Sequence, residues 1–286
     1  MIEKPTVVLI LGASGMLGNA ALRFFAESPN YRVVGGMRSA GAIAKFPAGF
    51  RGHLRTGVDL ERLEPLFAEV SPDVVVNCVG VVKQLQQAED PLAVIPINSL
   101  LPHRLARLCK ASGARLIHIS TDCVFSGRKG SYGEEDAPDA RDLYGRSKLL
   151  GEIDGGNAIT LRTSIIGHEL GVPHGLVGWF LSQRGRVKGY RRAVFSGLPT
   201  VELARVMRDF VIPRPELKGI FHVSAEPINK YDLLALVAAQ YKHACELAPD
   251  DEVVIDRSLD STKFRRATGY VASSWPRLIE AMHRFC

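Results

Sequence analysis

Short, continuous apolar runs alternate with longer helical patterns as far as about residue 165, and this alternation restricts the fold more than any other feature. Helices are expected over residues 17–27 and 100–110, because their apolar residues recur at helical spacing on one side. Apolar strands separated by helices are typical of a parallel sheet covered on both faces. The sequence therefore predicts an α/β fold with a doubly wound parallel sheet. The expected strands are residues 7–11, 32–35, 74–78, 116–120 and 158–162.

The alternation breaks down in the later part of the chain, where glycine and proline become denser and the candidate elements shorter. A strand is expected over residues 222–225, and Asn229 is a plausible N-cap for a helix that runs to about Tyr241. We interpret residues 1–166 as one domain. Residues 167–286 are expected to form mainly a smaller portion that binds a substrate, with some segments returning to the first domain.

The composition indicates a folded protein without a nucleic-acid partner. With 286 residues, 46% of them hydrophobic, the chain can bury a substantial core. Its net charge of +6 comes from scattered basic residues, with no basic run interleaved with aromatics. Five cysteines without C-x-x-C spacing predict free thiols in a reducing compartment and no structural metal. No segment approaches the roughly 20 apolar residues needed to span a bilayer, so a cytoplasmic protein without a membrane partner is expected.

A glycine-rich turn joins the first expected strand to the first expected helix. Gly12, Gly15 and Gly18 form the pattern G-x-x-G-x-x-G there. Such glycines let the backbone approach a pyrophosphate, while free N–H groups at the helix N-terminus attract its negative charge. The sequence therefore predicts a dinucleotide-binding turn of the Rossmann type. The residues between the glycines are also expected to line the cofactor: Ser14, Met16 and Leu17.

The end of the second expected strand bears on the choice of cofactor. An acidic residue there would hold the adenosine ribose hydroxyls and repel a 2′-phosphate. The chain has none, and Arg38 instead places a guanidinium where that phosphate would lie. NADPH is therefore the expected cofactor, with NADH as the alternative. Asp59 is expected either to face the adenine or to cap a helix.

Tyr144 and Lys148 are four residues apart, so on a helix their side chains lie along one face. A nearby ammonium stabilises a phenolate, which is expected to lower the pKa of Tyr144 from about 10 and make it a usable proton donor or acceptor. Both residues follow a strand that ends in Ser120, Thr121 and Asp122, at the carboxyl edge where ligands bind in open parallel sheets. This combination predicts chemistry at a carbonyl or an alcohol.

In these motifs the chain resembles the extended short-chain dehydrogenases/reductases, and within them the dTDP-4-dehydrorhamnose reductase family. The resemblance runs through nearly the whole length. It implies reduction of the 4-keto group of a nucleotide-linked 6-deoxyhexulose by a reduced nicotinamide cofactor, in the biosynthesis of cell-surface polysaccharides. Besides the glycine turn, it is carried by Asn77-Cys-Val-Gly80, Ile97-Asn-Ser, Ser120-Thr-Asp-Cys-Val-Phe-Ser-Gly127, Tyr144-Gly-Arg-Ser-Lys148, Leu161-Arg-Thr-Ser164 and Phe195-Ser-Gly-Leu-Pro-Thr200.

The resemblance also implies roles for individual residues. Tyr144 would protonate the C4 oxygen, Thr121 would donate a hydrogen bond to it, and Lys148 would hold the nicotinamide ribose. Further positions expected at the cofactor are Cys78, Val79, Gly80, Asn98, Ser120, Arg162, Thr163 and Ser164. Positions expected at the substrate are Asp122, Cys123, Val124, His174 and Trp179, with Lys188, Arg191 and Arg192 as candidate contacts of its diphosphate.

The residue after Asp122 departs from the family pattern. The family usually has a tyrosine there, whereas this chain has Cys123. Nucleotide-sugar dehydratases resemble Thr-Asp-Glu at this place, and the missing glutamate disfavours elimination of water. A cysteine here resembles GDP-fucose synthase, in which a cysteine and a histidine epimerise the sugar, and His174 is the candidate partner. The alternative is that Cys123 is a packing residue and His174 a loop residue.

Two functional classes stay open from the sequence. The first is an enzyme, a nucleotide-sugar reductase. The second is a regulatory protein that keeps the fold and the cofactor site without turnover, as does the regulatory subunit of methionine adenosyltransferase, a relative of this family. The intact Thr121, Tyr144 and Lys148 favour the enzyme. The nucleotide base, the substituent at C2 of the sugar and the oligomeric state, including a homodimer, are not fixed by the sequence.

Overall fold

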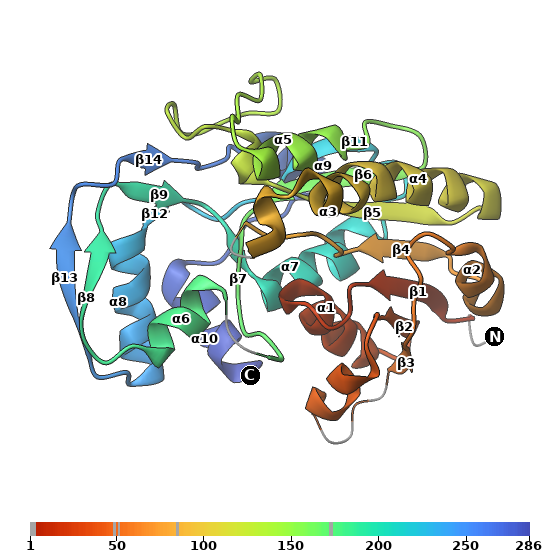
Figure 1. Ribbon diagram of the computed structural model, residues 1–286, viewed down its shortest axis with the longest axis horizontal. Helices are drawn as coiled ribbons and strands as arrows, with labels where there is room; N and C mark the ends of the chain where they lie inside the picture. Colours follow the sequence, from red (N-terminus) through yellow and green to blue (C-terminus); the bar gives the residue numbers. More distant parts are fainter. Residues whose placement is uncertain (1–3, 48–49, 51, 84–85, 172–173) are drawn as a thin grey trace.

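A seven-stranded parallel sheet forms the centre of the computed structural model, which describes residues 4–286 except 48–49, 51, 84–85 and 172–173 (Figure 1). Its strands are β1 (Thr6–Leu11), β2 (Tyr31–Gly36), β3 (His53–Arg55), β4 (Val74–Asn77), β5 (Arg115–Thr121), β6 (Ala158–Thr163) and β11 (Gly219–His222). They lie in the order β11-β6-β5-β4-β1-β2-β3, and every neighbouring pair is parallel. The order reverses at β1, so the predicted doubly wound sheet is confirmed.

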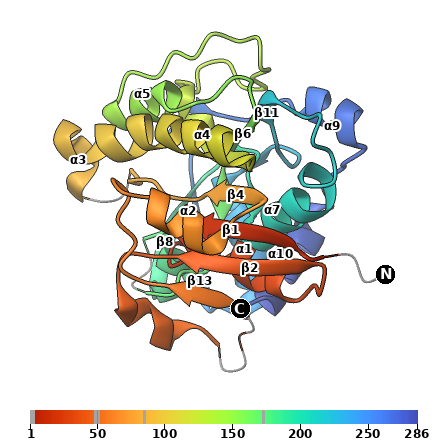
Figure 2. The same ribbon diagram turned by 90° about the vertical axis from the view of Figure 1, so that its right-hand side faces the viewer.

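Helices cover both faces of this sheet because successive apolar side chains of each strand point to opposite faces. Ile10 packs in one core cluster with residues of α1 and α7, and Leu9 in another with residues of α2 and α4. Two views at right angles show α4 and α5 above β1 and β4 (Figure 1, Figure 2). These helices are α1 (Met16–Ala26), α2 (Glu64–Val70), α4 (Leu101–Ser112), α5 (Leu143–Leu150) and α7 (Thr200–Val206).

The later part of the chain builds a second layer beside the carboxyl ends of β1 and β4 (Figure 1). α8 (Lys230–Tyr241) begins after Asn229, whose side chain accepts a hydrogen bond from the Asp232 N–H at 2.8 Å, so the predicted cap is confirmed. α6 (Leu176–Ser182) packs against α8. The small sheets of this layer are β8 (Gly185–Tyr190) with β13 (Cys245–Asp250), β9 (Ala193–Phe195) with β12 (Ile228–Asn229) and β14 (Ile255–Asp256), and β7 (Ile165–Ile166) with β10 (Leu198–Pro199).

The strand predicted at residues 222–225 is wrong in position. The observed strand, β11, ends where the prediction begins and pairs with β6. After it, the Val223 N–H still donates to the Arg162 carbonyl at 2.9 Å, but the Ala225 N–H donates to the Ser196 carbonyl at 2.8 Å. The chain therefore leaves the sheet and enters the second layer at this point. Since β11 belongs to the central sheet, the later part of the chain contributes to both layers, and the division into two domains stays a prediction.

The remaining helices are short or peripheral, and they complete the cover of the two layers. They are α3 (Pro91–Ile95), α9 (Thr262–Thr268) and α10 (Trp275–Arg284), with single turns at Ala40–Lys45, Gln86–Glu89, Pro96–Leu100, Asp122–Val124 and Met207–Val211. All five cysteines are free, as predicted. Among the residues that the structure describes, no helix combines the length and the apolar character that crossing a bilayer requires.

Candidate active site

The glycine turn forms a cradle between β1 and α1. Gly12 adopts a φ of +80°, and a Cβ there would lie 3.0 Å from the carbonyl carbon of Cys78. A Cβ on Gly18 would lie 2.1 Å from the Gly12 carbonyl oxygen, so α1 can pass this close to the turn only with glycine. Gly15 precedes α1, whose first turn holds no acidic residue, which leaves its N-terminal N–H groups to an anion. The turn therefore fits a cofactor pyrophosphate.

The three predicted cofactor residues between these glycines differ in how exposed their side chains are. Ser14 is exposed in the turn, and Met16 is half-buried at the start of α1, so both side chains lie at the surface of the cradle. Leu17 is only 4% exposed and belongs to the core cluster of α1. Its side chain packs in the core under α1. The group of Leu17 that can contact an anion is therefore its backbone N–H.

Two asparagines fix the loop that follows β4. Asn77 Oδ1 accepts a hydrogen bond from the Val79 N–H at 3.1 Å. Asn98 Oδ1 accepts one from the Val81 N–H at 2.9 Å, and its Nδ2 donates to the Val81 carbonyl at 3.1 Å. Asn98 is buried and therefore acts through this loop. The loop begins beside Gly12 and contains the predicted cofactor residues Cys78, Val79 and Gly80.

Arg38 lies just beyond β2 with an exposed side chain. Its guanidinium forms no hydrogen bond or ion pair within the part of the chain that the structure describes. Asp59 Oδ1 accepts a hydrogen bond from the Glu61 N–H at 2.8 Å in a turn that ends before α2 begins. Asp59 thus caps a turn, and the alternative that it caps a helix is wrong. Its place at the adenine stays a prediction, as does the contact of Arg38 with a 2′-phosphate.

Thr121, Tyr144 and Lys148 come together at the carboxyl end of β5. Thr121 is the buried last residue of this strand, and Tyr144 and Lys148 lie one turn apart on α5. The Thr121 side chain is among the groups that influence the pKa of Tyr144, so the two side chains are neighbours. Lys148 Nζ donates to the Ile119 carbonyl at 2.7 Å, which ties α5 to the strand. The structure therefore places a hydroxyl, a phenol and an ammonium at one edge of the sheet.

The electrostatics of Tyr144 contradict the expectation that Lys148 lowers its pKa. Burial raises the pKa of Tyr144 above its usual range, the neighbouring Cys123 thiol raises it further, and the Thr121 side chain opposes them. Lys148 is not among the groups that most influence this pKa, and its Nζ donates to the Ile119 carbonyl. Burial also lowers the pKa of Lys148 itself to about 8. The phenol therefore stays protonated at neutral pH.

Arg162 and Ser120, both predicted at the cofactor, are tied to Glu152. Arg162 Nη2 lies 2.7 Å from Glu152 Oε2, and both side chains are 4% exposed. Ser120 Oγ donates to Glu152 Oε1 at 2.6 Å. The guanidinium of Arg162 is thus held inside the protein, and its contact with the cofactor stays a prediction. Glu152 escaped the sequence reasoning, although its position four residues after Lys148 was a signal.

Cys123 sits among charged groups at the start of the loop after β5. Its N–H donates to Thr121 Oγ1 at 3.1 Å. Burial, and then the Asp122 carboxyl, raise the pKa of Cys123 to about 12, while Arg257 opposes them. Burial also raises the pKa of Asp122, opposed by Arg257 and Lys230. A thiol with so high a pKa is a poor base at neutral pH.

Two cations that the sequence reasoning missed, Lys230 and Arg257, flank this loop. Lys230 Nζ lies 3.8 Å from the centre of the Phe195 ring. Burial lowers the pKa of Lys230, while Asp122 and Cys123 raise it. Arg257 Nε donates to the Phe125 carbonyl at 2.9 Å. No local motif reveals these two residues, because the fold brings them to the loop from far along the chain.

His174 borders the glycine turn. Its N–H donates to Glu169 Oε2 at 2.7 Å, its side chain is exposed, and a Cβ on the following Gly175 would lie 2.5 Å from Met16 Cε. It is not among the groups that most influence the pKa of Cys123. The geometry thus lends no support to epimerisation by these two residues. Trp179, on α6, is 41% exposed, and its substrate contact stays a prediction.

The candidate diphosphate contacts lie at the end of β8. Lys188 Nζ pairs with Asp250 Oδ2 at 2.7 Å, and Arg191 pairs with Asp251. Arg192 is exposed beside them. All three side chains face solvent, and two are already paired, so a role at a diphosphate stays a prediction.

The remaining predicted residues close the carboxyl edge of the sheet. Thr163 ends β6 and is buried, and its Oγ1 donates to the Ser164 carbonyl at 3.2 Å. Ser164 is half-buried. Val124 is fully buried in a small cluster with Phe125 and Tyr132, so it supports the loop after β5 instead of facing a ligand.

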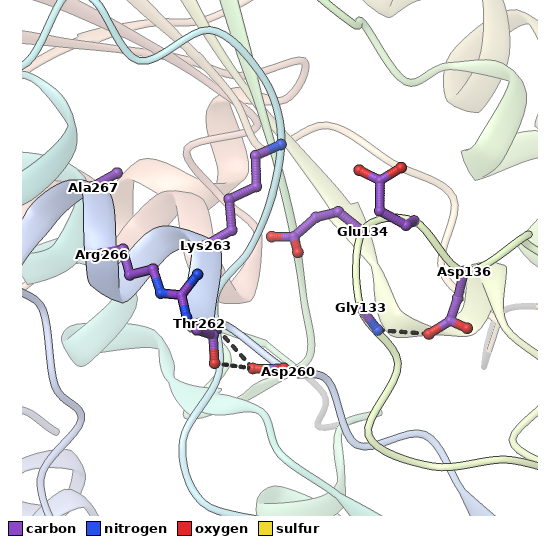
Figure 3. Close-up of a pocket in the computed structure, with 9 residues that line it drawn as sticks. Gly133, Glu134, Asp136, Asp260, Thr262, Lys263, Arg266 and Ala267 are labelled. Atoms are coloured by element: carbon purple, nitrogen blue, oxygen red, sulfur yellow. Dashed lines mark hydrogen bonds between the residues drawn. The ribbon is translucent and has the colours of Figure 1, made fainter.

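A hollow of about 650 Å³ lies elsewhere, between the loop after β5 and α9 (Figure 3). None of the predicted site residues lines it. In Figure 3 the side chains of Glu134 and Lys263 lie on opposite sides of the opening. Glu134 Oε1 also accepts a hydrogen bond from the His222 N–H at 2.8 Å, at the end of β11. The lining residues are Gly133, Glu134, Glu135, Asp136, Asp260, Thr262, Lys263, Arg266 and Ala267.

The order of the site's groups along the chain defines the class of the protein. The cofactor turn comes first, the hydroxyl at the end of β5 follows, and the tyrosine and lysine lie on the next helix, as in the extended short-chain dehydrogenases/reductases, which are NAD(P)-dependent oxidoreductases. The chain belongs to the family described as the RmlD substrate binding domain, whose model matches residues 6–277. The predicted family is therefore confirmed.

Proteins with similar sequences are named for two different functions. The methionine adenosyltransferase 2 subunit beta of Mus musculus is 30% identical over 314 residues, which cover 97% of this chain and 90% of the mouse protein. A dTDP-4-dehydrorhamnose reductase of Streptomyces griseus is 34% identical over 145 residues, covering 50% of this chain and 43% of that protein.

Solved structures share the fold over nearly the whole chain. The dTDP-4-dehydrorhamnose reductase of Bacillus anthracis, in complex with NADP, superposes with a TM-score of 0.78 at 18% identity and covers 98% of this chain and 99% of that one. The Bordetella bronchiseptica enzyme WbmG, in complex with NAD, gives a TM-score of 0.78 at 18% identity, with 99% and 94% covered. Proteins of this fold thus hold both forms of the cofactor.

Proposed function

We propose that the protein catalyses the NADPH-dependent reduction of the 4-keto group of a nucleotide-linked 4-keto-6-deoxyhexose, with dTDP or UDP as the nucleotide. The meeting of Thr121, Tyr144 and Lys148 at the same carboxyl edge of the sheet as the glycine turn carries this proposal. The family membership and the name of the Streptomyces griseus relative support it. A place in cell-surface polysaccharide biosynthesis follows from the same substrate class.

Each of the three residues has a distinct task in this reduction. The nicotinamide cofactor, when bound, supplies the hydride that C4 gains. Tyr144, which stays protonated because its pKa is raised, gives the C4 oxygen its phenolic proton. The Thr121 hydroxyl, which donates to Asp122 Oδ1 at 3.2 Å in the structure, turns to the same oxygen as negative charge develops. Lys148 binds the ribose hydroxyls of the cofactor through its ammonium.

Turnover of a small substrate panel tests the proposal. The protein is mixed with NADPH and dTDP- or UDP-linked 4-keto-6-deoxy sugars, with and without an acetamido group at C2. NADPH consumption is followed by absorbance, and mass spectrometry identifies the products. A product two hydrogens heavier than its substrate supports a reductase and names the base and the C2 substituent. No consumption with any member of the panel would contradict the proposal.

A regulatory, non-catalytic role is the second candidate, because the mouse methionine adenosyltransferase subunit matches 97% of this chain. Such a protein would keep the cradle at Gly12, Gly15 and Gly18 and bind NADPH without turnover. Tight NADPH binding by calorimetry, combined with no consumption across the panel, favours this candidate. The intact Thr121, Tyr144 and Lys148 favour the enzyme.

Replacing Arg38 by Ala should weaken NADPH binding by about 10- to 100-fold and leave NADH binding nearly unchanged. The exposed guanidinium is expected to form charge-assisted hydrogen bonds with the 2′-phosphate, which NADH lacks. Fluorescence titration of both cofactors measures the two dissociation constants. Arg55→Ala, which removes an exposed arginine that is already paired with Glu69, is the matched control. If Arg38→Ala weakened the binding of NADPH and NADH equally, Arg38 would not be a contact of the 2′-phosphate.

Replacing Lys230 by Met should raise KM for the nucleotide sugar by about tenfold or more, while NADPH affinity stays near that of the wild type. The ammonium lies near Asp122 and Cys123, two of the positions expected at the substrate, so its loss should remove a contact of the sugar nucleotide. Lys110→Met, which removes an exposed lysine in the last turn of α4, serves as the control. Steady-state kinetics measure KM for the nucleotide sugar. If Lys230→Met lowered the affinity for NADPH and left this KM unchanged, Lys230 would belong to the cofactor site.

A further inference from the structure

A buried histidine stands behind the loop that follows β4. His118 and Asn77 are both fully buried, and they lie opposite each other in the parallel register of β4 and β5. Asn77 Nδ2 and His118 Nδ1 are 3.1 Å apart, which is hydrogen-bond distance. The other end of the same amide, Asn77 Oδ1, accepts a hydrogen bond from the Val79 N–H at 3.1 Å. The side chain of Asn77 thus connects β5 to the loop in which Val79 lies.

The Val79 N–H fixes the direction of both hydrogen bonds. A backbone N–H can only donate, so the oxygen of the Asn77 amide must face it, and the NH2 group must face His118. His118 Nδ1 is therefore the accepting nitrogen of a neutral ring, and the ring proton is on Nε2. Burial holds the pKa of His118 well below its ordinary range, which agrees with a neutral ring. Nε2 is buried without a hydrogen-bond partner among the described residues, so the contact with Asn77 decides the tautomer.

The loop that Asn77 holds lies directly against the glycine turn. A Cβ placed on Gly12 would lie 3.0 Å from the carbonyl carbon of Cys78, 3.1 Å from its oxygen and 3.1 Å from the nitrogen of Val79. The Cys78 N–H also donates to the Leu11 carbonyl at 3.0 Å, which ties the loop to the strand that precedes the turn. Because the loop and the turn are this close, the position of Val79 helps to set the width of the cradle.

We propose that His118 is a positioning residue for the cofactor: through Asn77 it orients the loop of Val79 and Gly80 beside the glycine turn. His118 Nδ1 keeps the Asn77 amide oxygen turned towards the Val79 N–H. The acceptor is needed there because a buried NH2 group without a partner is costly, and the Asn77 side chain would move to satisfy it. The inference rests on the proposed function only in taking NADPH as the ligand of the turn.

Two substitutions of His118 separate the accepting atom from the imidazole ring. His118→Leu removes the acceptor, whereas His118→Asn retains one, because the Oδ1 of asparagine is attached to Cγ as the Nδ1 of histidine is. NADPH affinity should fall by about tenfold in His118→Leu and stay within about threefold of the wild type in His118→Asn. Fluorescence titration measures both dissociation constants. An equal loss in the two variants, or no loss in His118→Leu, would overturn the proposal.

Hydrogen exchange of the Val79 amide reports the same contact in the protein without ligands. Under conditions that give the two variants equal global stability, exchange at Val79 should be faster in His118→Leu than in His118→Asn. Equal exchange rates at Val79 would count against the proposal. If the wild type does not bind NADPH, the proposed function fails, whereas the exchange of Val79 still decides the role of His118.

The tautomer of His118 can be measured in the wild type, so this test stays decisive if His118→Leu does not fold. NMR of protein with nitrogen-labelled histidine distinguishes the ring nitrogen that carries the proton from the one that does not. The signals of His118 are assigned by their disappearance in His118→Asn. The expected state at neutral pH is a neutral ring with its proton on Nε2. A proton on Nδ1 would face the Asn77 NH2 group as a second donor, and this result would refute the proposal.

Discussion

Replacing Tyr144 by Phe is expected to lower kcat by about two to four orders of magnitude and to leave NADPH affinity nearly unchanged. The phenol is the proton donor in the proposed reduction, and phenylalanine keeps the ring while it removes the proton. The phenol carries this proton at neutral pH, because burial holds its pKa above its usual range. Single-turnover kinetics with saturating NADPH measure the chemical step separately from binding.

Thr121→Val provides the matched comparison for Tyr144→Phe. It removes the hydroxyl beside Tyr144 but retains the acid, so the loss of rate should be smaller. An equal loss of NADPH affinity and of rate in Tyr144→Phe would contradict its assignment as the proton donor. Because the phenol stays protonated well above neutral pH and burial lowers the pKa of Lys148 to about 8, we expect activity to decline as pH rises through about 8, where Lys148 loses its charge.

Replacing Gly18 by Ala abolishes measurable NADPH binding and destabilises the fold by about 1–3 kcal/mol. The new Cβ would lie 2.1 Å from the Gly12 carbonyl oxygen and 2.6 Å from its carbonyl carbon. These are backbone atoms, so the clash can be relieved only if α1 moves away from the turn and withdraws its N-terminal N–H groups from the pyrophosphate. Thermal unfolding and a fluorescence titration with NADPH measure the two effects.

Gly41→Ala is the control for Gly18→Ala. Its new Cβ would meet Ser39 Oγ at 3.6 Å, which is ordinary van der Waals contact, so stability and NADPH affinity should stay near those of the wild type. If Gly18→Ala bound NADPH as the wild type does, the turn would not be the pyrophosphate site.

The fold could be predicted from the sequence because its signals are local. The strands of the central sheet are continuous apolar runs, and the first crossover helix shows its apolar stripe, so the periodicity alone separates them. β11 was misplaced because its buried residues continue as an apolar run into Val223, and only the hydrogen bond of Ala225 to Ser196 shows where the chain leaves the sheet. The residues between 219 and 225 do not indicate by themselves that Ser196 is the hydrogen-bond partner of Ala225.

The site was predicted in part for the same reason. Tyr144 and Lys148 follow from a four-residue spacing, and Gly18 from its place after an apolar strand. The expected lowering of the pKa of Tyr144 was wrong because spacing on a helix gives proximity to Lys148 but does not reveal how deeply the phenol is buried, and burial raises its pKa. Lys230 and Arg257 could not be found, since their proximity to Cys123 arises only from the packing of the second layer on the first.

The edge strand β11 makes the folding of the two layers interdependent. It pairs with β6, and its last residue, His222, contacts Arg162, which in turn forms a buried ion pair with Glu152. The ribosome completes the cofactor turn, Thr121 and Tyr144 long before it reaches residues 219–222. Until then β6 has an open edge and Arg162 lacks one of its partners. The nascent chain therefore carries Thr121, Tyr144 and Lys148 before it has the edge strand that completes the sheet, and we expect the native site to form only when this late, long-range pairing forms.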